Sequence, residues 1–170
     1  MKKIILLVVA LALASCGGKD KKNIEVENAE ASKDKYSLVL DGIYENNDSI
    51  VVFYQVDGYF KYDKPVTRII KGNPMVQRIK IDLPSESIIE NISLVASTNK
   101  DQKYLTLKNI SLMNDTVNVV DGDNYKHSQY FLTDNSFSWD AAKQRYNLLH
   151  TNKYPPSFSG NDKLKTLLTK

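Results

Sequence analysis

Apolar and polar positions alternate along much of the chain between residues 36 and 120. The clearest case is Ile79, Ile81 and Leu83, which are separated by charged residues and followed by Pro84. A period of two predicts a strand with one buried and one solvated face, and proline ends it because it cannot donate to a sheet ladder. Runs of alternating or β-branched residues predict strands at 36–40, 49–56, 66–71, 79–83, 92–96, 105–112 and 116–120.

One of these strands changes phase midway. Leu105 and Leu107 share one phase of the alternation. Ile110 and Leu112 share the opposite phase. Because a slip of one residue moves every later side chain to the other face of a sheet, the pattern predicts a β-bulge or bend at residues 108–109.

Turn-forming sequences separate the predicted strands, among them Asp-Gly, Asn-Asn-Asp, Gly-Asn-Pro and Asp-Gly-Asp-Asn. Six to eight short strands with regular turns predict an all-β domain over residues 36–170, built as a single jelly-roll-like β-sandwich. At its end, residues 159–162 are typical of a helix cap, and Leu164, Leu167 and Leu168 fall at helical spacing. A short C-terminal helix is therefore expected.

The N-terminus has a different pattern. Two lysines precede an unbroken apolar run over residues 4–14, which is shorter than the roughly 20 residues needed to span a bilayer. This indicates a signal peptide over residues 1–15. The run ends in Leu-Ala-Ser-Cys, which resembles the lipobox of bacterial lipoproteins. The resemblance implies that Cys16 carries a diacylglyceryl group and starts the mature protein. The alternative is a buried cysteine at the end of a hydrophobic helix.

The segment that follows Cys16 has no aromatic residue and no sustained apolar period. Such a composition predicts that residues 16–35 form a disordered tether; a short amphipathic helix over 25–31 is the competing interpretation. By the sorting rule of Gram-negative lipoproteins, Gly17 after the cysteine implies the outer membrane, because aspartate there would retain the protein at the inner membrane. Whether the domain faces the periplasm or the cell surface stays open.

Charge and composition exclude several function classes. Removing Lys2 and Lys3 with the leader reduces the 23 basic residues to 21, against 20 acidic ones, so the mature chain has a charge of about +1. With no basic cluster among aromatic residues, no nucleic-acid partner is expected. A single cysteine and two histidines leave few metal or nucleophilic constellations. No catalytic motif is present, and we expect no enzyme, although paired carboxylates of glycosidase type stay open.

A second resemblance covers residues 36–125. Val52-Phe-Tyr, Gly58-Tyr-Phe, Gln77-Arg-Ile-Lys-Ile-Asp-Leu-Pro and Leu107-Lys-Asn-Ile-Ser-Leu are similar to segments of galactose-binding-like jelly-roll modules of Gram-negative envelope proteins. The resemblance implies a carbohydrate-binding module. It transfers no ligand residue, because modules of this fold vary their binding loops freely.

Aromatic side chains are the candidate glycan-binding residues, because the apolar face of a pyranose stacks on an aromatic ring. The most aromatic turn contains Tyr59, Phe60 and Tyr62. Trp139 beside an aspartate and Tyr154 beside two prolines are the other candidates. Tyrosine and tryptophan are also common in the core and rim of any small sandwich, and this is the competing interpretation.

Two further motifs have weaker chemical signals. Asp121 and Asp123 stand at alternate positions, as at the start of a calcium loop, but the later residues of an EF-hand are missing, so a plain turn is the competing interpretation. Ser49 and Thr116 each follow an aspartate and precede an apolar residue. That pattern is O-glycosylated in some Gram-negative bacteria, and it is also ordinary turn chemistry.

Together these observations predict a lipid-anchored outer-membrane lipoprotein that carries a non-catalytic binding module, for glycan. No cofactor is expected beyond the lipid on Cys16. The alternative function is structural, with the sandwich docking a protein partner of the envelope through an exposed edge strand.

Overall fold

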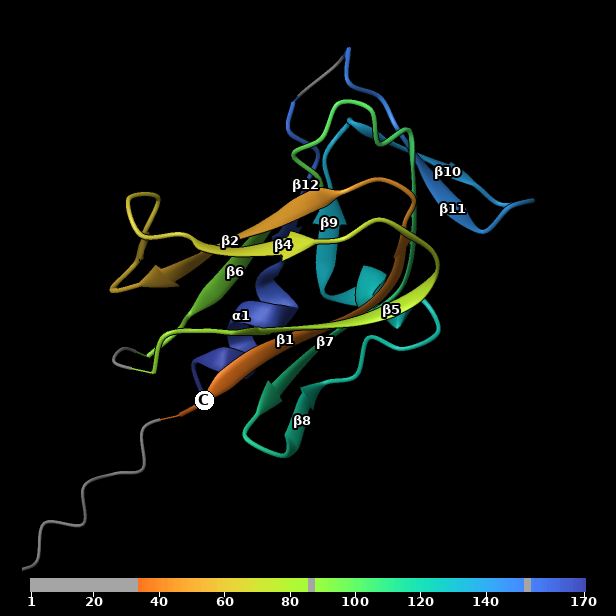
Figure 1. Cartoon of the computed structure of the whole chain (residues 1–170). Coiled ribbons are helices and arrows are strands. Elements are labelled where there is room, and N and C mark those ends of the chain that lie inside the picture. The colour runs from red at the N-terminus through yellow and green to blue at the C-terminus, as the bar shows by residue number, and fades with distance from the viewer. Residues whose placement is uncertain (1–33, 86–87, 152–153) are drawn as a thin grey trace, which may run out of the picture. The chain divides into compact units, whose positions relative to one another are not determined.

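Two antiparallel sheets pack face to face as a β-sandwich in the computed structural model, which describes residues 34–85, 88–151 and 154–170 (Figure 1). The predicted all-β sandwich is therefore confirmed. The predicted signal peptide, Cys16 and the tether up to residue 33 lie outside the described residues. Lys35, assigned to the tether from the sequence, is hydrogen-bonded through its backbone N–H to the side chain of Asn114 at 3.1 Å.

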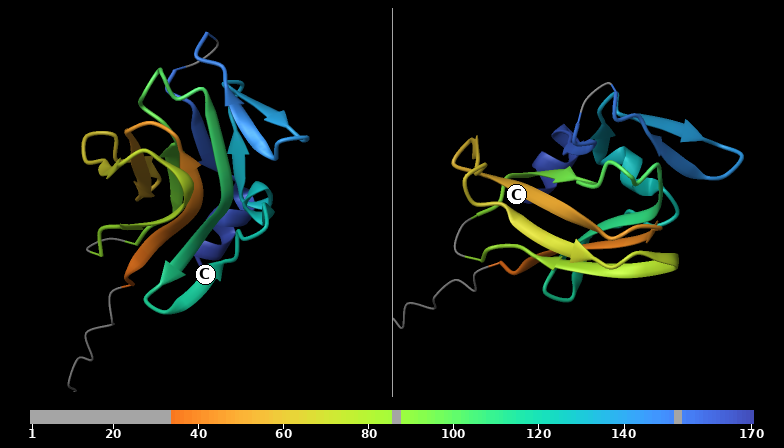
Figure 2. Two further views of the ribbon diagram at one scale, coloured as in Figure 1. Left: turned by 45° about the vertical axis from the view of Figure 1, so that its right-hand side comes forward. Right: turned by 45° about the horizontal axis from the view of Figure 1, so that its top comes forward.

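The first sheet has the strand order β10-β11-β7-β1-β5, and β8 pairs with β7. The strands β1 and β7 pair with each other and lie side by side in this sheet (Figure 2). Its strands are β1 (Tyr36–Tyr44), β5 (Asn73–Asp82), β7 (Tyr104–Asn114), β8 (Val117–Val120), β10 (Phe137–Asp140) and β11 (Arg145–Leu148).

The second sheet has the order β3-β2-β6-β12-β9, and β4 pairs with β2. A 3-10 helix, η1 (Lys126–Gln129), precedes β9, and one α-helix, α1 (Asp162–Leu168), follows β12. The strands are β2 (Asp48–Val56), β3 (Tyr59–Phe60), β4 (Val66–Ile70), β6 (Asn91–Val95), β9 (Phe131–Thr133) and β12 (Ser157–Gly160).

The core lies between the sheets and follows from the alternation in the sequence. In β2 every second residue is buried, and the residues between are half-buried. Leu38 and Leu40 of β1 face the core together with Leu105, Leu107 and other apolar residues, all fully buried. Each fully buried aliphatic side chain contributes about 1.5–3 kcal/mol relative to exposure, so these strands supply most of the driving force for folding.

The predicted bulge is present. Asp41 of β1 pairs with Asn109 of β7, whereas the next residue, Gly42, pairs with Leu107. Lys108 is the extra residue, and the register changes across it. The bulge lets Leu107 and Ile110 both reach the core although their spacing in the sequence is odd.

The predicted C-terminal helix is confirmed. The side-chain oxygen of Asn161 accepts hydrogen bonds from the backbone N–H groups of Lys163 and Leu164 at 3.0 and 3.2 Å. Leu164 and Leu168 are buried on the helix face that packs against the sandwich. No helix within the described ranges is long and apolar enough to cross a membrane.

The strands after residue 120 are absent from the sequence-based prediction. β9, β10, β11 and β12 have three or four residues each, too few to show a period of two. They form the outer part of both sheets beside β7 and β6. β5 also begins earlier than expected, at Asn73, and β3 forms within the turn that contains Tyr59.

Candidate functional site

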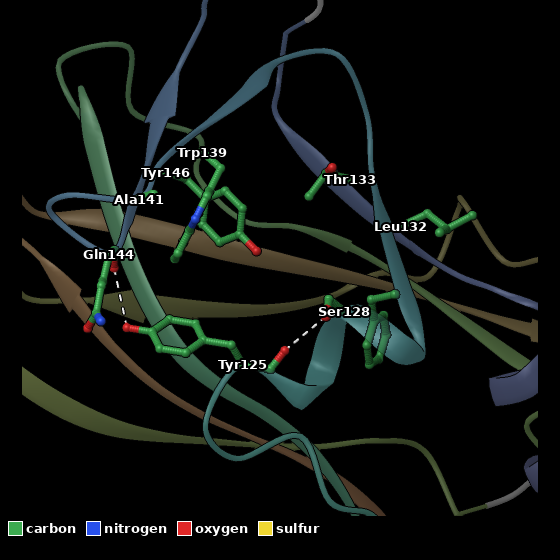
Figure 3. Close-up of a pocket in the computed structure, with 9 residues that line it drawn as sticks. Tyr125, Ser128, Leu132, Thr133, Trp139, Ala141, Gln144 and Tyr146 are labelled. Atoms are coloured by element: carbon green, nitrogen blue, oxygen red, sulfur yellow. Dashed lines mark hydrogen bonds between the residues drawn. The ribbon is translucent and has the colours of Figure 1, made fainter.

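A pocket of about 600 Å³ opens where the outermost strands of the two sheets, β9 and β10, meet at one side of the sandwich. Its residues come from η1, β9 and the β10–β11 hairpin with the segments beside them (Figure 3). The lining residues are Tyr125, Ser128, Phe131, Leu132, Thr133, Trp139, Ala141, Gln144 and Tyr146.

One wall of the pocket is aromatic. The Trp139 ring makes edge-to-face contacts with Tyr125, at 5.4 Å between ring centroids, and with Tyr146, at 4.9 Å. Trp139 is nevertheless 45% exposed. Two flanking rings therefore hold the indole in place while part of its surface stays available to a ligand.

Aromatic side chains that are partly or fully buried support this wall from behind. Tyr146 packs edge-to-face against Phe137 at 5.4 Å and against Phe158 at 5.6 Å. The Nε2 atom of the fully buried His127 lies 3.3 Å from the Tyr146 hydroxyl. Burial lowers the pKa of His127 to about 4, so the imidazole is neutral at pH 7. The wall is thus fixed to the core without a buried charge.

Hydroxyl and amide groups supply the polar part of the pocket. Ser128 donates a hydrogen bond to the Tyr125 carbonyl at 3.0 Å, and the Tyr125 hydroxyl donates to the Gln144 carbonyl at 3.3 Å (Figure 3). These hydroxyl oxygens keep lone pairs that can accept from a ligand. Thr133 adds an exposed hydroxyl from β9.

The bulge in β7 positions Tyr125. The Lys108 carbonyl accepts a hydrogen bond from the Tyr125 backbone N–H at 3.0 Å. Asn124 and Tyr125 have φ of 53° and 66°, in the left-handed region that costs a non-glycine residue energy. The carbonyl at the bulge therefore holds a strained turn in the conformation that presents the tyrosine ring.

A chain of buried polar groups fixes the same turn. The Asn109 amide donates to the Asp41 carboxylate at 3.0 Å, and the Ser111 hydroxyl donates to Asn109 at 2.6 Å. The Gly122 backbone N–H in turn donates to the Ser111 hydroxyl at 3.1 Å. A Cβ on Gly122 would lie 1.9 Å from the Ile110 carbonyl oxygen, so only glycine allows this close approach.

The structure separates the candidate glycan-binding residues. Trp139 lies in the pocket, on a strand rather than a loop. The β2–β3 hairpin and the residues just after it hold Tyr59, Phe60 and Tyr62, and none of these three lines the pocket. Tyr62 stacks on Phe60 with 5.8 Å between centroids and also contacts Phe53 at 5.0 Å. Tyr59 and Tyr62 are exposed and Phe60 is half-buried, so this hairpin has an aromatic surface separate from the pocket.

Tyr154 also lies away from the pocket. Its hydroxyl donates a hydrogen bond to the Thr98 carbonyl. The Lys100 ammonium lies 5.0 Å from the centre of its ring, and the His150 ring contacts it at 5.7 Å. These contacts hold together two loops at one end of the sandwich, which favours a packing role for Tyr154.

The Asp121–Asn124 segment forms a turn in which both carboxylates have protein partners. Asp121 pairs with the Lys126 ammonium at 2.9 Å, and this contact lowers the pKa of the carboxyl group. Asp123 accepts hydrogen bonds from the backbone and side chain of Asn124 at 2.8 and 3.2 Å. Across the part of the chain that the structure describes, no three His, Cys, Asp or Glu residues gather as a metal site.

The two candidate O-glycosylation residues differ in access. Thr116 is exposed in the β7–β8 turn, beside Asp115 with its φ of 51°. Ser49 is half-buried in β2, and its hydroxyl is hydrogen-bonded to the Thr98 hydroxyl at 2.7 Å. Of the two, only the Thr116 hydroxyl lies where an enzyme could reach it on the folded domain.

The sequence analysis did not identify most residues that line the pocket. Tyr125 directly follows a recognised turn, and Tyr146 lies opposite Trp139 on the hairpin partner strand. An aromatic residue on each side of residues 140–145 could have suggested a hairpin with paired rings. Ser128, Thr133 and Gln144 carry no such signal.

No protein-family model, curated protein or solved structure matches this chain.

Proposed function

We propose that this protein is a lipid-anchored lipoprotein of the cell envelope whose sandwich is a non-catalytic module that binds glycan in the Trp139 pocket. The observation that supports this most directly is the half-exposed Trp139 ring, flanked by Tyr125 and Tyr146 in a pocket with hydroxyl groups. It combines a stacking surface with hydrogen-bonding groups at one place.

The chemistry of the pocket suits a sugar. A pyranose ring has an apolar face of C–H groups, which stacks on an indole, and an edge of hydroxyl groups, which need hydrogen-bond partners once they leave water. Ser128, Thr133 and Gln144 can supply those partners. A volume of about 600 Å³ is within the range of small-ligand sites and leaves room for more than one sugar ring.

The proposed lipid anchor would strengthen overall binding even if a single glycan site has low affinity. Lipid on Cys16 would hold the domain at the membrane, because each buried methylene contributes about 0.8 kcal/mol and lipoproteins have two or three chains. Many anchored copies facing a glycan-bearing surface bind through high effective concentration, even where one site binds weakly.

Tryptophan fluorescence tests the binding directly, because Trp139 is the only tryptophan in the sequence. Residues 34–170 would first be screened on a glycan array, and hits would then be titrated while indole emission is followed. Binding should shift the emission, and Trp139→Ala should weaken array binding by at least about tenfold. Tyr59→Ala, at a residue 75% exposed on another hairpin, is the matched control and should bind normally. Equal binding by the two variants would reject the pocket.

The anchor has a separate test. In cells that express the full chain, labelled fatty acid should be incorporated into the wild type and not into Cys16→Ser. The variant should also move from the membrane fraction to the soluble fraction. Labelling of Cys16→Ser equal to that of the wild type would reject the lipobox.

A protein partner is the second candidate function, and the edge of the first sheet favours it. Within the described part of the chain, β5 pairs with a strand on one side only, β1, and its Met75 side chain is 68% exposed. Because Pro74 and the charged Arg78 and Lys80 on the same strand oppose the addition of another strand, the proposed contact surface is the exposed Met75 and Val76 side chains. A photo-crosslinker at residue 75 that captures one envelope protein, with loss of capture in a Val76→Lys background, would favour this function.

A further inference from the structure

We infer that the Trp139 pocket selects an uncharged sugar residue and discriminates against the same sugar carrying a carboxylate. The inference rests on the proposed function and names the ligand class of that site.

Among the residues that the structure describes, those that line the pocket carry no charged side chain. All nine residues that form it are aromatic, aliphatic, hydroxyl or amide residues. The titratable side chain directly behind the wall, His127, is buried and contacts the Tyr146 hydroxyl. A carboxylate that entered the pocket would therefore meet no cation among these lining residues.

Of the cations nearest in sequence to the lining residues, Lys143 is exposed and does not line the pocket, and the other two have partners elsewhere. The Arg145 guanidinium lies over the Tyr104 ring, 3.5 Å from its centre. Lys126 is paired with Asp121. The Asp140 carboxylate accepts a hydrogen bond from the Lys143 backbone N–H at 3.1 Å, which closes the β10–β11 turn.

The energetic consequence follows from desolvation. A hydroxyl group that leaves water can be satisfied by the Thr133 and Ser128 hydroxyls and the Gln144 amide. A carboxylate loses far more hydration, and neutral donors alone compensate only part of that loss. Aromatic rings add to the discrimination, because the negative face of a π-system repels an anion.

Matched sugar pairs test this selectivity. Methyl glucoside and methyl glucuronide, and the corresponding galactose pair, differ only at C6, where CH2OH is replaced by a carboxylate. Titrations of the full chain, followed by Trp139 emission, should give at least about tenfold weaker binding for each glycuronide than for its neutral partner. Binding of the neutral sugar should change little between about 0.05 and 0.5 M salt, because no ion pair is screened.

A charge-introducing variant sharpens the test. Thr133→Lys places an ammonium at the pocket and should raise affinity for the glycuronide, in a way that salt reverses. Thr133→Gln introduces a longer side chain without the charge and should give no such gain. Ile69→Lys adds the same charge at a residue 82% exposed on β4, remote from the pocket, and should also give no gain.

The outcomes separate this inference from the proposed function. Neutral-sugar binding that exceeds glycuronide binding supports both. Glycuronide binding equal to or tighter than that of the neutral partner overturns the inference and leaves glycan binding standing. A chain that binds neither member of any pair, and no glycan on the array, overturns both.

Discussion

The central β1–β7 pair and the aromatic edge around Trp139 are built on different principles. β1 and β7 are long strands of 9 and 11 residues, with aliphatic side chains fully buried between the sheets. The aromatic edge consists of short strands, half-exposed rings and three residues in the left-handed region, Asn124, Tyr125 and Gln144. Of the described non-glycine residues with positive φ, only Asp57 and Asp115 lie outside this edge.

The difference shows how stability and binding are divided. The central pair buries apolar side chains that stabilise the fold and do not line the pocket. The edge keeps aromatic surface accessible and accepts strained backbone to do so, a combination typical of functional sites. The bulge at Lys108 joins the two regions, because it lies in the central pair and holds the turn of Tyr125.

The largest expected effect lies in the central pair. Leu38→Ala removes a fully buried side chain and leaves a cavity, which should lower the free energy of unfolding by about 3–4 kcal/mol. Glycan affinity of the folded fraction should stay unchanged, because neither Leu38 nor its partner Leu112 on β7 lines the pocket. Urea unfolding measures the first and titration below the transition the second. Ile69→Ala, at an exposed position, should lower the free energy of unfolding by less than about 0.5 kcal/mol. Equal losses of stability in the two variants would contradict the distinction between core and surface.

The second-largest effect is expected from acidification, which should lower the free energy of unfolding through His127 behind the aromatic edge. Folding lowers the pKa of His127 from 6.5 to about 4, so between these values the unfolded chain binds a proton that the folded chain does not. His127 should therefore cost ~3 kcal/mol of stability as the pH falls from 6.5 to 4, with no further loss below.

The control for this prediction is His127→Phe, which keeps a ring beside Phe158 but cannot titrate. Urea unfolding at several pH values should show a shallower decline for the variant. Parallel curves for the two proteins would mean that His127 does not contribute to the acid sensitivity.

A substitution at the junction should affect both regions. Gly122→Ala pushes a Cβ against the Ile110 carbonyl of β7 and should destabilise the protein by about 2 kcal/mol. Because the Tyr125 turn must shift, glycan affinity should fall as well. Gly58→Ala is the matched control: its φ of +80° gives a cost of about 1 kcal/mol, but it lies on the β2–β3 hairpin and should leave affinity intact. Unchanged affinity in Gly122→Ala would show that the turn does not position the site.

The smallest effect is expected from Tyr125→Phe. It keeps the ring against Trp139 and removes only the hydroxyl that donates to the Gln144 carbonyl. Stability should fall by about 0.5–1 kcal/mol, and thermal unfolding is sensitive enough to detect it. Stacking on Trp139 should persist, so affinity should drop less than in Trp139→Ala. A loss as large as that of Trp139→Ala would assign the hydroxyl itself to ligand binding.

The strands up to residue 120 and the bulge were predictable because their signals are local. A period of two needs only a few consecutive residues, and the phase change between Leu107 and Ile110 locates the extra residue within one position. Asn161 and the leucines after it likewise mark a helix by short-range spacing. Strands of three or four residues, such as β9 and β11, contain too little repetition to be recognised.

The candidate site was predictable only in part. Trp139 was identified as an aromatic candidate, but so were Tyr59, Phe60, Tyr62 and Tyr154, which the fold places elsewhere. Aromatic composition does not distinguish a ring that lines a pocket from one that packs a loop, because both environments favour the same side chains.

The strand-rich class, the register change in β7 and the closing helix could therefore be predicted from the sequence, since each depends on neighbours along the chain. It also predicts the lipid anchor, through a motif that lies outside the described residues. That Tyr125, Trp139 and Tyr146 share one wall became evident only from the folded arrangement of the strands. That arrangement depends on which strands end at the same side of the two sheets, and pairing between distant segments leaves no short-range trace in the sequence.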